Sequence, residues 1–243
     1  MSENLHKFFY KDYFEEGIKP SGNITRLNRK LTGLTPKDIG EVEKVEYVNA
    51  DFKMKVCYPG LITGVGVSHE MGVEGEIKLG INFDYTHGTP IISGSTVKGV
   101  LRSYFPQVYD LQNPDINAAI LDIFEGKKPD GSTKSIYERD IFFDASVVRD
   151  KNKNEERKTI FEMDALAPHS QDDPFKEPIP ITFAKIAPGC TIEFRFHLSG
   201  EKECRDKKEE WFKKILTTYG IGAKTNVGYG RLEELKEVEP NNK

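Results

Sequence analysis

Residues 190–230 constrain the fold of this chain more than any other segment, because two clear periodicities follow one another there. The segment CTIEFRFHL at 190–198 alternates apolar and polar side chains, which predicts a strand with one buried face. Residues 201–219 carry apolar side chains at helical spacing, and Gly220 stands where a helix C-terminus prefers glycine. A glycine-rich turn and a strand from residue 228 complete a predicted β-α-β unit.

The upstream patterns repeat this arrangement and indicate the fold class. In chain order, the predicted strong elements are strand 52–58, helix 95–105, strand 139–148, strand 190–198, helix 203–219 and strand 228–235. This β-α-β-β-α-β order is typical of the ferredoxin-like (RRM-like) fold of the α+β class. Right-handed crossovers would give a four-stranded antiparallel sheet with two helices on one face.

The remaining segments are expected to surround one domain. The predicted boundaries are an N-terminal arm at 1–40, a single domain at 41–238, insertions at about 110–135 and 150–185, and a tail at 239–243. A helix starting at Asn113-Pro114 and a proline-rich loop at 164–184 would lie in the insertions. The aromatic start of the arm and its basic stretch at 26–30 leave two alternatives. The arm either packs through its aromatic side chains or contacts RNA.

The composition excludes several classes of protein. The net charge of −4 argues against a chain coated with basic residues, although a local basic stripe would still bind phosphates. No apolar run approaches the roughly 20 residues that span a bilayer, and the N-terminus lacks the features of a signal peptide. We therefore expect a cytoplasmic protein without a membrane partner. Cys57, Cys190 and Cys204 form no CxxC pair, so we expect reduced thiols and no metal or cofactor.

The first candidate binding segment is GIGAKTNVGYG at 220–230. Its glycines allow a positive φ and a close approach of a ligand, and free N–H groups in such a turn can form an anion-binding nest beside Lys224. The segment does not match the nucleotide-binding motifs. A dinucleotide fingerprint requires glycine at position 225, which is Thr225 here, and a P-loop requires glycine at position 223, which is Ala223. The alternative is a glycine-rich hairpin without a ligand.

The second candidate segment is GTPIISGSTVKGVLR at 88–102. A Ser/Thr-rich turn that opens a helix presents N–H groups and the positive end of the helix dipole, which suits phosphate. Lys98 and Arg102 are four residues apart and share one helix face. The alternative is an ordinary capped helix with two solvated cations.

Together the two segments resemble the signature motifs of the RAMP superfamily of CRISPR-associated proteins. Its members pair a helix start of the form G-x-P-[IV]-I-P-G-S-S-L-K-G-x-[LI]-R with a C-terminal G-[IV]-G-x-x-x-x-x-G-[FY]-G loop on a ferredoxin-like fold. This chain matches both patterns, with Ser93 in place of the usual proline. Its middle segment contains DALAPH and PIPITF, which resemble the Asp-x-x-x-Pro-His and Pro-x-Pro-Ile-x-Phe motifs of the sixth Cmr-type subunit of type III-B effector complexes. The resemblance covers about residues 50–235.

The resemblance implies a non-catalytic subunit that binds RNA. Such subunits lie near the 3′ portion of the guide (CRISPR) RNA, beside other RAMP subunits, in a ribonucleoprotein that targets invader RNA in antiviral defence. Lys98 and Arg102 would face guide phosphates, and the 220–230 loop would cradle the sugar-phosphate chain. The predicted RNA-binding residues are Ser95, Thr96, Lys98, Arg102, Gly220, Gly222, Lys224, Thr225, Asn226, Gly228, Gly230 and Arg231. The predicted partners are guide RNA, target RNA and other RAMP subunits.

Two enzyme alternatives remain open at this point. Another RAMP protein could act as a metal-independent or target-cleaving endoribonuclease, with His69, His87 or His169 as general base. Asp164, His169, Asp172 and Asp173 could hold a divalent metal, but they show no ligand periodicity. We expect these groups to be structural and predict no catalytic residue.

Overall fold

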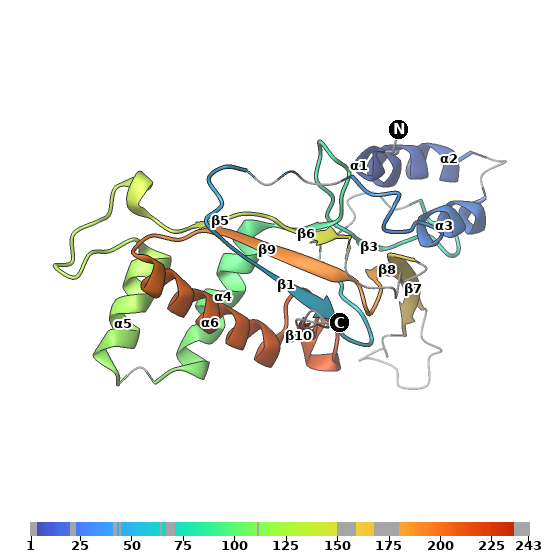
Figure 1. Cartoon of the computed structure of the whole chain (residues 1–243). Helices are drawn as coiled ribbons and strands as arrows, with labels where there is room; N and C mark the ends of the chain where they lie inside the picture. The colour runs from blue at the N-terminus through green and yellow to red at the C-terminus, as the bar shows by residue number, and fades with distance from the viewer. Residues whose placement is uncertain are drawn as a thin grey trace, which may run out of the picture.

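Two β-sheets, one large and one small, form the framework of the chain (Figure 1). The computed structural model describes residues 4–19, 23–40, 43, 45–63, 65–66, 71–110, 112–149, 159–167 and 180–235. Helices α4, α5 and α6 lie on one side of the larger sheet, whereas α1, α2 and α3 lie near the smaller sheet (Figure 1). The predicted α+β class is confirmed.

The larger sheet holds six strands in the order β10-β1-β9-β6-β4, with β5 paired to β9. Its strands are β1 (Ala50–Val56), β4 (Ile91–Ile92), β5 (Ile141–Phe142), β6 (Ala145–Val148), β9 (Thr191–His197) and β10 (Leu232–Glu234). Every pairing is antiparallel, and β1 and β9 place Phe52 opposite Phe194. In the described residues this sheet therefore has two strands more than the four predicted.

Two of the predicted strands need correction. The strand expected at 139–148 is divided into β5 and β6, because Asp144 between them turns its carboxylate to the start of a helix and accepts a hydrogen bond from Gly94 N. The strand expected at 228–235 is limited to β10, since residues 228–230 belong to a turn instead.

The smaller sheet has the strand order β2-β3-β8-β7. Its strands are β2 (Val65–Gly66), β3 (Leu79–Gly80), β7 (Phe161–Leu166) and β8 (Ile181–Ile186). The loop predicted at 164–184 is wrong at both ends, because β7 and β8 pair from Phe161↔Ile186 to Leu166↔Ile181. Residues 168–179 of that loop, like the hydrophilic run at 150–158, lie outside the described residues.

The two long helices lie where the sequence predicts them. Helix α4 (Gly94–Val108) buries Val97, Leu101 and Phe105, and α6 (Lys202–Tyr219) buries Phe212, Ile215 and Leu216. Gly220 ends α6 with a φ of 72°. Tyr104 of α4 stacks on Tyr219 of α6 with ring centroids 4.1 Å apart, so the helices pack directly on each other. Helix α5 (Pro114–Ile120) starts at the predicted Asn113, whose side chain accepts a hydrogen bond from Asp115 N, and continues as η2 (Leu121–Glu125).

The described part of the N-terminal arm forms short helices. They are α1 (Leu5–Lys7), η1 (Phe8–Asp12), α2 (Tyr13–Gly17) and α3 (Ile24–Thr32). Phe8, Phe9 and Tyr13 are buried in the main core, and burial raises the pKa of Tyr13 to about 12. Of the basic stretch, Arg26 contacts Glu16 at 3.8 Å and Lys30 lies over Phe8. These contacts favour the alternative in which the arm packs through its aromatic side chains.

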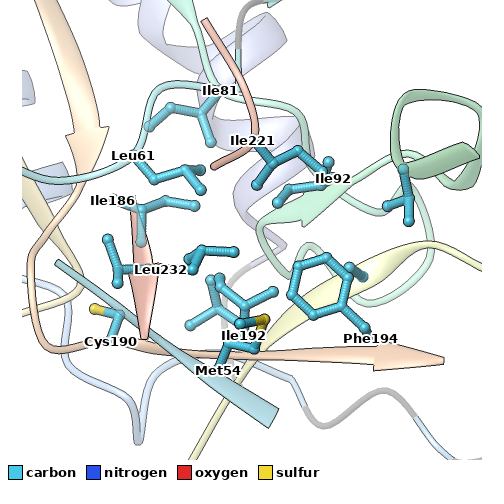
Figure 2. Close-up of a cluster of buried hydrophobic side chains, with 14 of the residues drawn as sticks. Met54, Leu61, Ile81, Ile92, Ile186, Cys190, Ile192, Phe194, Ile221 and Leu232 are labelled. Carbon is cyan, nitrogen blue, oxygen red and sulfur yellow. The ribbon is translucent and has the colours of Figure 1, made fainter. Parts of the chain in front are cut away.

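One hydrophobic core contains side chains from the larger sheet, the long helices and the N-terminal arm. Figure 2 shows Met54 of β1, Ile192 of β9 and Leu232 of β10 in one cluster of buried side chains. Ile92, at the end of β4 and just before the cap of α4, belongs to the same cluster, as does Ile221, which follows the cap of α6 (Figure 2). The core thus anchors the starting points of both candidate binding segments.

Candidate nucleic-acid interface

The glycine-rich loop at 220–230 closes on itself after α6. Ile221 N donates to Gly230 O at 2.9 Å, and a Cβ on Gly230 would lie 1.8 Å from Ile221 O. A Cβ on Gly220 would lie 2.5 Å from Gly230 O. Glycine is therefore required at both ends of the loop for backbone packing, whether or not a ligand binds there.

The loop also rests on the segment that follows β1. Ala223 N donates to Ile62 O at 2.8 Å, and Gly230 N donates to Gly60 O at 2.8 Å. Gly222 approaches Ile62 so closely that a Cβ would lie 2.3 Å from its carbonyl oxygen. Several N–H groups of the loop are thus bonded to backbone carbonyls, which corrects the prediction of a nest of free N–H groups. No sequence motif signals this contact with residues 60–62.

The loop and Arg231, which directly follows it, expose positive charge; below, Arg231 is counted with the loop. Lys224 and Arg231 are exposed, and in the part of the chain that the structure describes neither has a carboxylate partner. Lys224 has a φ of 58°, a left-handed conformation that lysine rarely adopts, and it precedes the short helix η4 (Thr225–Val227). Asn226 is exposed and Thr225 is half-buried in η4. The loop is therefore a rigid support for two exposed cations.

The polar groups at the start of α4 have more hydrogen-bond partners within the protein than the sequence predicts. Gly94 N donates to Asp144 Oδ1 at 2.7 Å, so the helix already holds a carboxylate where a phosphate was expected. A Cβ on Gly94 would lie 2.0 Å from Phe142 O, which explains the glycine by close packing. The hydroxyls of Ser95 and Thr96 contact Ser93 Oγ at 3.2 and 2.8 Å. The prediction that the N–H groups of this turn are unsatisfied is wrong for Gly94.

Lys98 and Arg102 share one face of α4, as predicted, but they have partners. Arg102 is exposed and forms an ion pair with Glu125. Lys98 is half-buried, with its ammonium 5.7 Å from the centroid of the Phe142 ring. Arg102 is therefore accessible but already paired, whereas Lys98 is only partly accessible.

A chain of hydrogen bonds connects the two candidate segments. Ile91 N, before α4, donates to Asn82 O, and Asn82 N donates to Thr63 Oγ1. Thr63 follows Ile62, whose carbonyl accepts from the loop residue Ala223. The two motifs are therefore held in a common frame, although they lie far apart in the sequence.

Tyr229 of the loop belongs to a polar network. Its hydroxyl donates to Asp164 Oδ2 at 2.8 Å, and Lys185 Nζ lies 2.6 Å from the same oxygen. Burial raises the pKa of Asp164, but the bonds from Lys185 and Tyr229 outweigh it and lower that pKa overall. Burial and the bond to Asp164 raise the pKa of Tyr229 to about 12. Asp164 thus ties the loop to the smaller sheet.

The groups considered for catalysis have structural contacts or fall outside the described residues. Of the candidate bases, His87 has its Nδ1 2.9 Å from Asp84 Oδ1 in a turn. His69, His169, Asp172 and Asp173 lie outside the described residues. Within the part of the chain that is described, no three His, Cys, Asp or Glu side chains gather as a metal site.

Comparison with known proteins identifies the class to which this chain belongs. The RAMP superfamily profile matches residues 53–233, so the chain belongs to the RAMP superfamily. It is 28% identical over 228 residues to the CRISPR system CMR subunit Cmr6 of Saccharolobus solfataricus, spanning 89% of this chain and 70% of that protein. It is 29% identical over 134 residues to Cmr6 of Pyrococcus furiosus, spanning 50% of this chain and 36% of that protein.

A solved structure is also similar. A chain in the cryo-EM structure of the type III-B Cmr-beta complex bound to cognate target RNA matches with a TM-score of 0.54 and 25% identity, covering 76% of this chain and 58% of that one. The predicted membership of the RAMP superfamily and the resemblance to the sixth Cmr-type subunit are confirmed. Among the helices that the structure describes, none has the length and apolar character needed to cross a membrane.

Proposed function

We propose that this chain is a non-catalytic RNA-binding subunit of a type III-B, Cmr-type CRISPR effector. It would bind the guide RNA near its 3′ portion, beside other RAMP subunits, and support RNA-guided targeting of invader RNA. The observation that carries the proposal is the pair of exposed cations, Lys224 and Arg231, on a rigid loop of a RAMP-superfamily chain. Its Cmr6 relatives and the similarity to a chain of a target-RNA-bound complex support the same assignment. A cytoplasmic location stays a prediction.

We also assign the larger sheet to a ferredoxin-like unit. The strands β1, β6, β9 and β10 have the order β10-β1-β9-β6, and all their pairings are antiparallel. Helix α4 follows β1 and α6 follows β9, and the two helices pack together. This arrangement supports the predicted βαββαβ unit, with β4, β5 and the smaller sheet added to it.

We expect the isolated protein to bind single-stranded RNA weakly, with a strong dependence on salt. Phosphate contacts release counterions, so log K should fall by roughly 0.7 per contact for each tenfold rise in salt. Fluorescence anisotropy with labelled RNA of mixed sequence, from low to high salt, measures this slope. An affinity that stays flat across this range would contradict binding through phosphates.

We further propose that the purified subunit has no nuclease activity. The described histidines, exemplified by His87 with Asp84, serve structural contacts, and no described cluster resembles a metal site. Labelled RNA should remain intact after hours of incubation with Mg²⁺ or with a chelator. Cleavage abolished by the chelator would indicate a metal-dependent nuclease. Cleavage that persists in chelator and disappears in the His87→Ala variant would favour the alternative endoribonuclease.

A further inference from the structure

We propose that Tyr58 is a stacking platform for a base of single-stranded RNA whose phosphates lie on the glycine-rich loop. This inference rests on the proposed function, because it adds a base contact to the same RNA site. Sequence reasoning missed Tyr58, since a single tyrosine before a proline carries no motif.

The side chain of Tyr58 is one of the most exposed aromatic side chains in the described part of the chain. It is 81% exposed, close to the values of Tyr85 and Tyr137. Its backbone is nevertheless fixed, because Gly60 N donates to Cys57 O at 2.9 Å and closes a turn around it. An aromatic ring held on a rigid turn loses little conformational freedom when a flat ligand stacks on it.

The turn that carries Tyr58 is bonded to the loop on both sides. Cys57 N donates to Arg231 O at 2.9 Å, and Gly60 O accepts a hydrogen bond from Gly230 N at 2.8 Å. Pro59 lies against Gly228, where a Cβ would be 3.7 Å from the proline Cδ. Tyr58 is therefore held in a fixed position beside the loop.

The neighbourhood has the chemistry of a single-stranded RNA site. Arg231 and Lys224 supply exposed positive charge, without carboxylate partners among the described residues. Tyr58 supplies an exposed aromatic face on the turn that is bonded to Gly230 and Arg231. Sites of this kind combine cations that follow the backbone with aromatic rings on which successive bases stack. Stacking tolerates any base, which suits a subunit that must accept guide RNAs of different sequence. The alternative is that Tyr58 contacts a neighbouring protein instead of RNA, and the test below distinguishes the two.

The experiment compares two exposed tyrosines against two RNAs. Tyr137 is 85% exposed on η3 (Ile136–Glu138). This segment, yellow-green in Figure 1, lies at the opposite end of the molecule from the tip of β1, so Tyr137→Ala is the matched control. Anisotropy measures binding of an oligouridine and of an abasic ribose-phosphate chain of equal length. Tyr58→Ala should weaken oligouridine binding about 5- to 100-fold and leave abasic binding unchanged. Tyr58→Trp should retain affinity and show quenched indole fluorescence on binding.

Three results would overturn the inference. In the first, Tyr58→Ala leaves oligouridine affinity within about twofold of wild type. In the second it weakens both RNAs equally. In the third, co-purification with the neighbouring RAMP subunits shows that Tyr58→Ala loses a neighbour while RNA is retained. If wild type binds RNA with a salt dependence but Tyr58→Ala has no effect, only this inference fails. If wild type binds neither RNA, the proposed function fails with it. Thermal unfolding of each variant checks that the fold is intact.

Discussion

Replacing Lys208 with methionine should lower the free energy of unfolding by about 3–5 kcal/mol. Lys208 is only 2% exposed, and its Nζ lies 2.7 Å from Asp140 Oδ2 and 3.0 Å from Asp122 Oδ2. The Asp140 side chain is fully buried, so the variant would leave its carboxylate without its cation. Urea unfolding followed by circular dichroism measures the change.

The control is Lys214→Met, on an exposed position of the same helix. Its effect should stay within about 0.5 kcal/mol. Adding Asp140→Asn to Lys208→Met should recover part of the loss, because the buried charge is then removed. Equal stability of wild type and Lys208→Met would show that the cluster does not stabilise the fold.

The pH dependence of stability follows from the same cluster of Lys208, Asp140 and Asp122. Burial lowers the pKa of Lys208, but Asp140 and Asp122 outweigh it, so that pKa is raised. Burial raises the pKa of Asp122, but Lys134 and Lys208 outweigh it and lower that pKa. The stabilisation from Lys208 is thus complete below its unfolded pKa of about 10.4, and that from Asp122 above about 3.9. The gap between wild type and Lys208→Met should shrink as pH falls below about 4 or rises above about 10.4.

Reversing both charges of the glycine-rich loop should have the largest effect on RNA binding. The double variant Lys224→Glu with Arg231→Glu should bind single-stranded RNA about 10- to 30-fold more weakly at about 0.1 M salt, and the salt slope should fall by about 1.4. Both side chains are exposed and lack carboxylate partners in the described part of the chain, so the fold should tolerate the change. Anisotropy across salt concentrations measures both quantities.

Two further double variants separate local from general charge effects. Lys202→Glu with Lys207→Glu changes the net charge equally on exposed positions of α6 and should leave RNA affinity within about twofold. Lys98→Glu with Arg102→Glu should weaken binding less than the loop variant, because Arg102 already pairs with Glu125. A full loss in the α4 variant and none in the loop variant would place the RNA on α4 instead.

Local patterns predicted much of the fold. The alternation in β9, the apolar stripe of α6 and its stop at Gly220 are properties of neighbouring residues, so they could be recognised without tertiary information. The sequence does not indicate strand β8, because prolines dominate the segment before it and because its pairing with β7 is decided by contacts across the chain. The break between β5 and β6 depends on Asp144 and a helix start that is distant in the sequence.

In the candidate site, too, the sequence indicates local features but not the contacts between distant residues. Both binding segments can be located from their motifs, but the motifs alone suggest that their glycines leave room for a ligand. In the structure, a Cβ on Gly222 or Gly230 would lie only 2.3 or 1.8 Å from a backbone carbonyl oxygen, so packing requires glycine there. Two contacts join residues that are far apart in the sequence, so no local pattern encodes them. They are the ion pair of Arg102 with Glu125 and the hydrogen bond from the loop to Ile62 O.

Co-purification tests the central claim most directly. The subunit is expressed together with its neighbouring RAMP subunits and a guide RNA, isolated through a tag on this chain, and analysed for protein and RNA. Wild type should retain a neighbouring subunit and a stoichiometric short RNA, whereas the Lys224→Glu, Arg231→Glu variant should keep the neighbour and lose RNA. Loss of the neighbour with retention of RNA would contradict the account, because the loop would then belong to the protein interface.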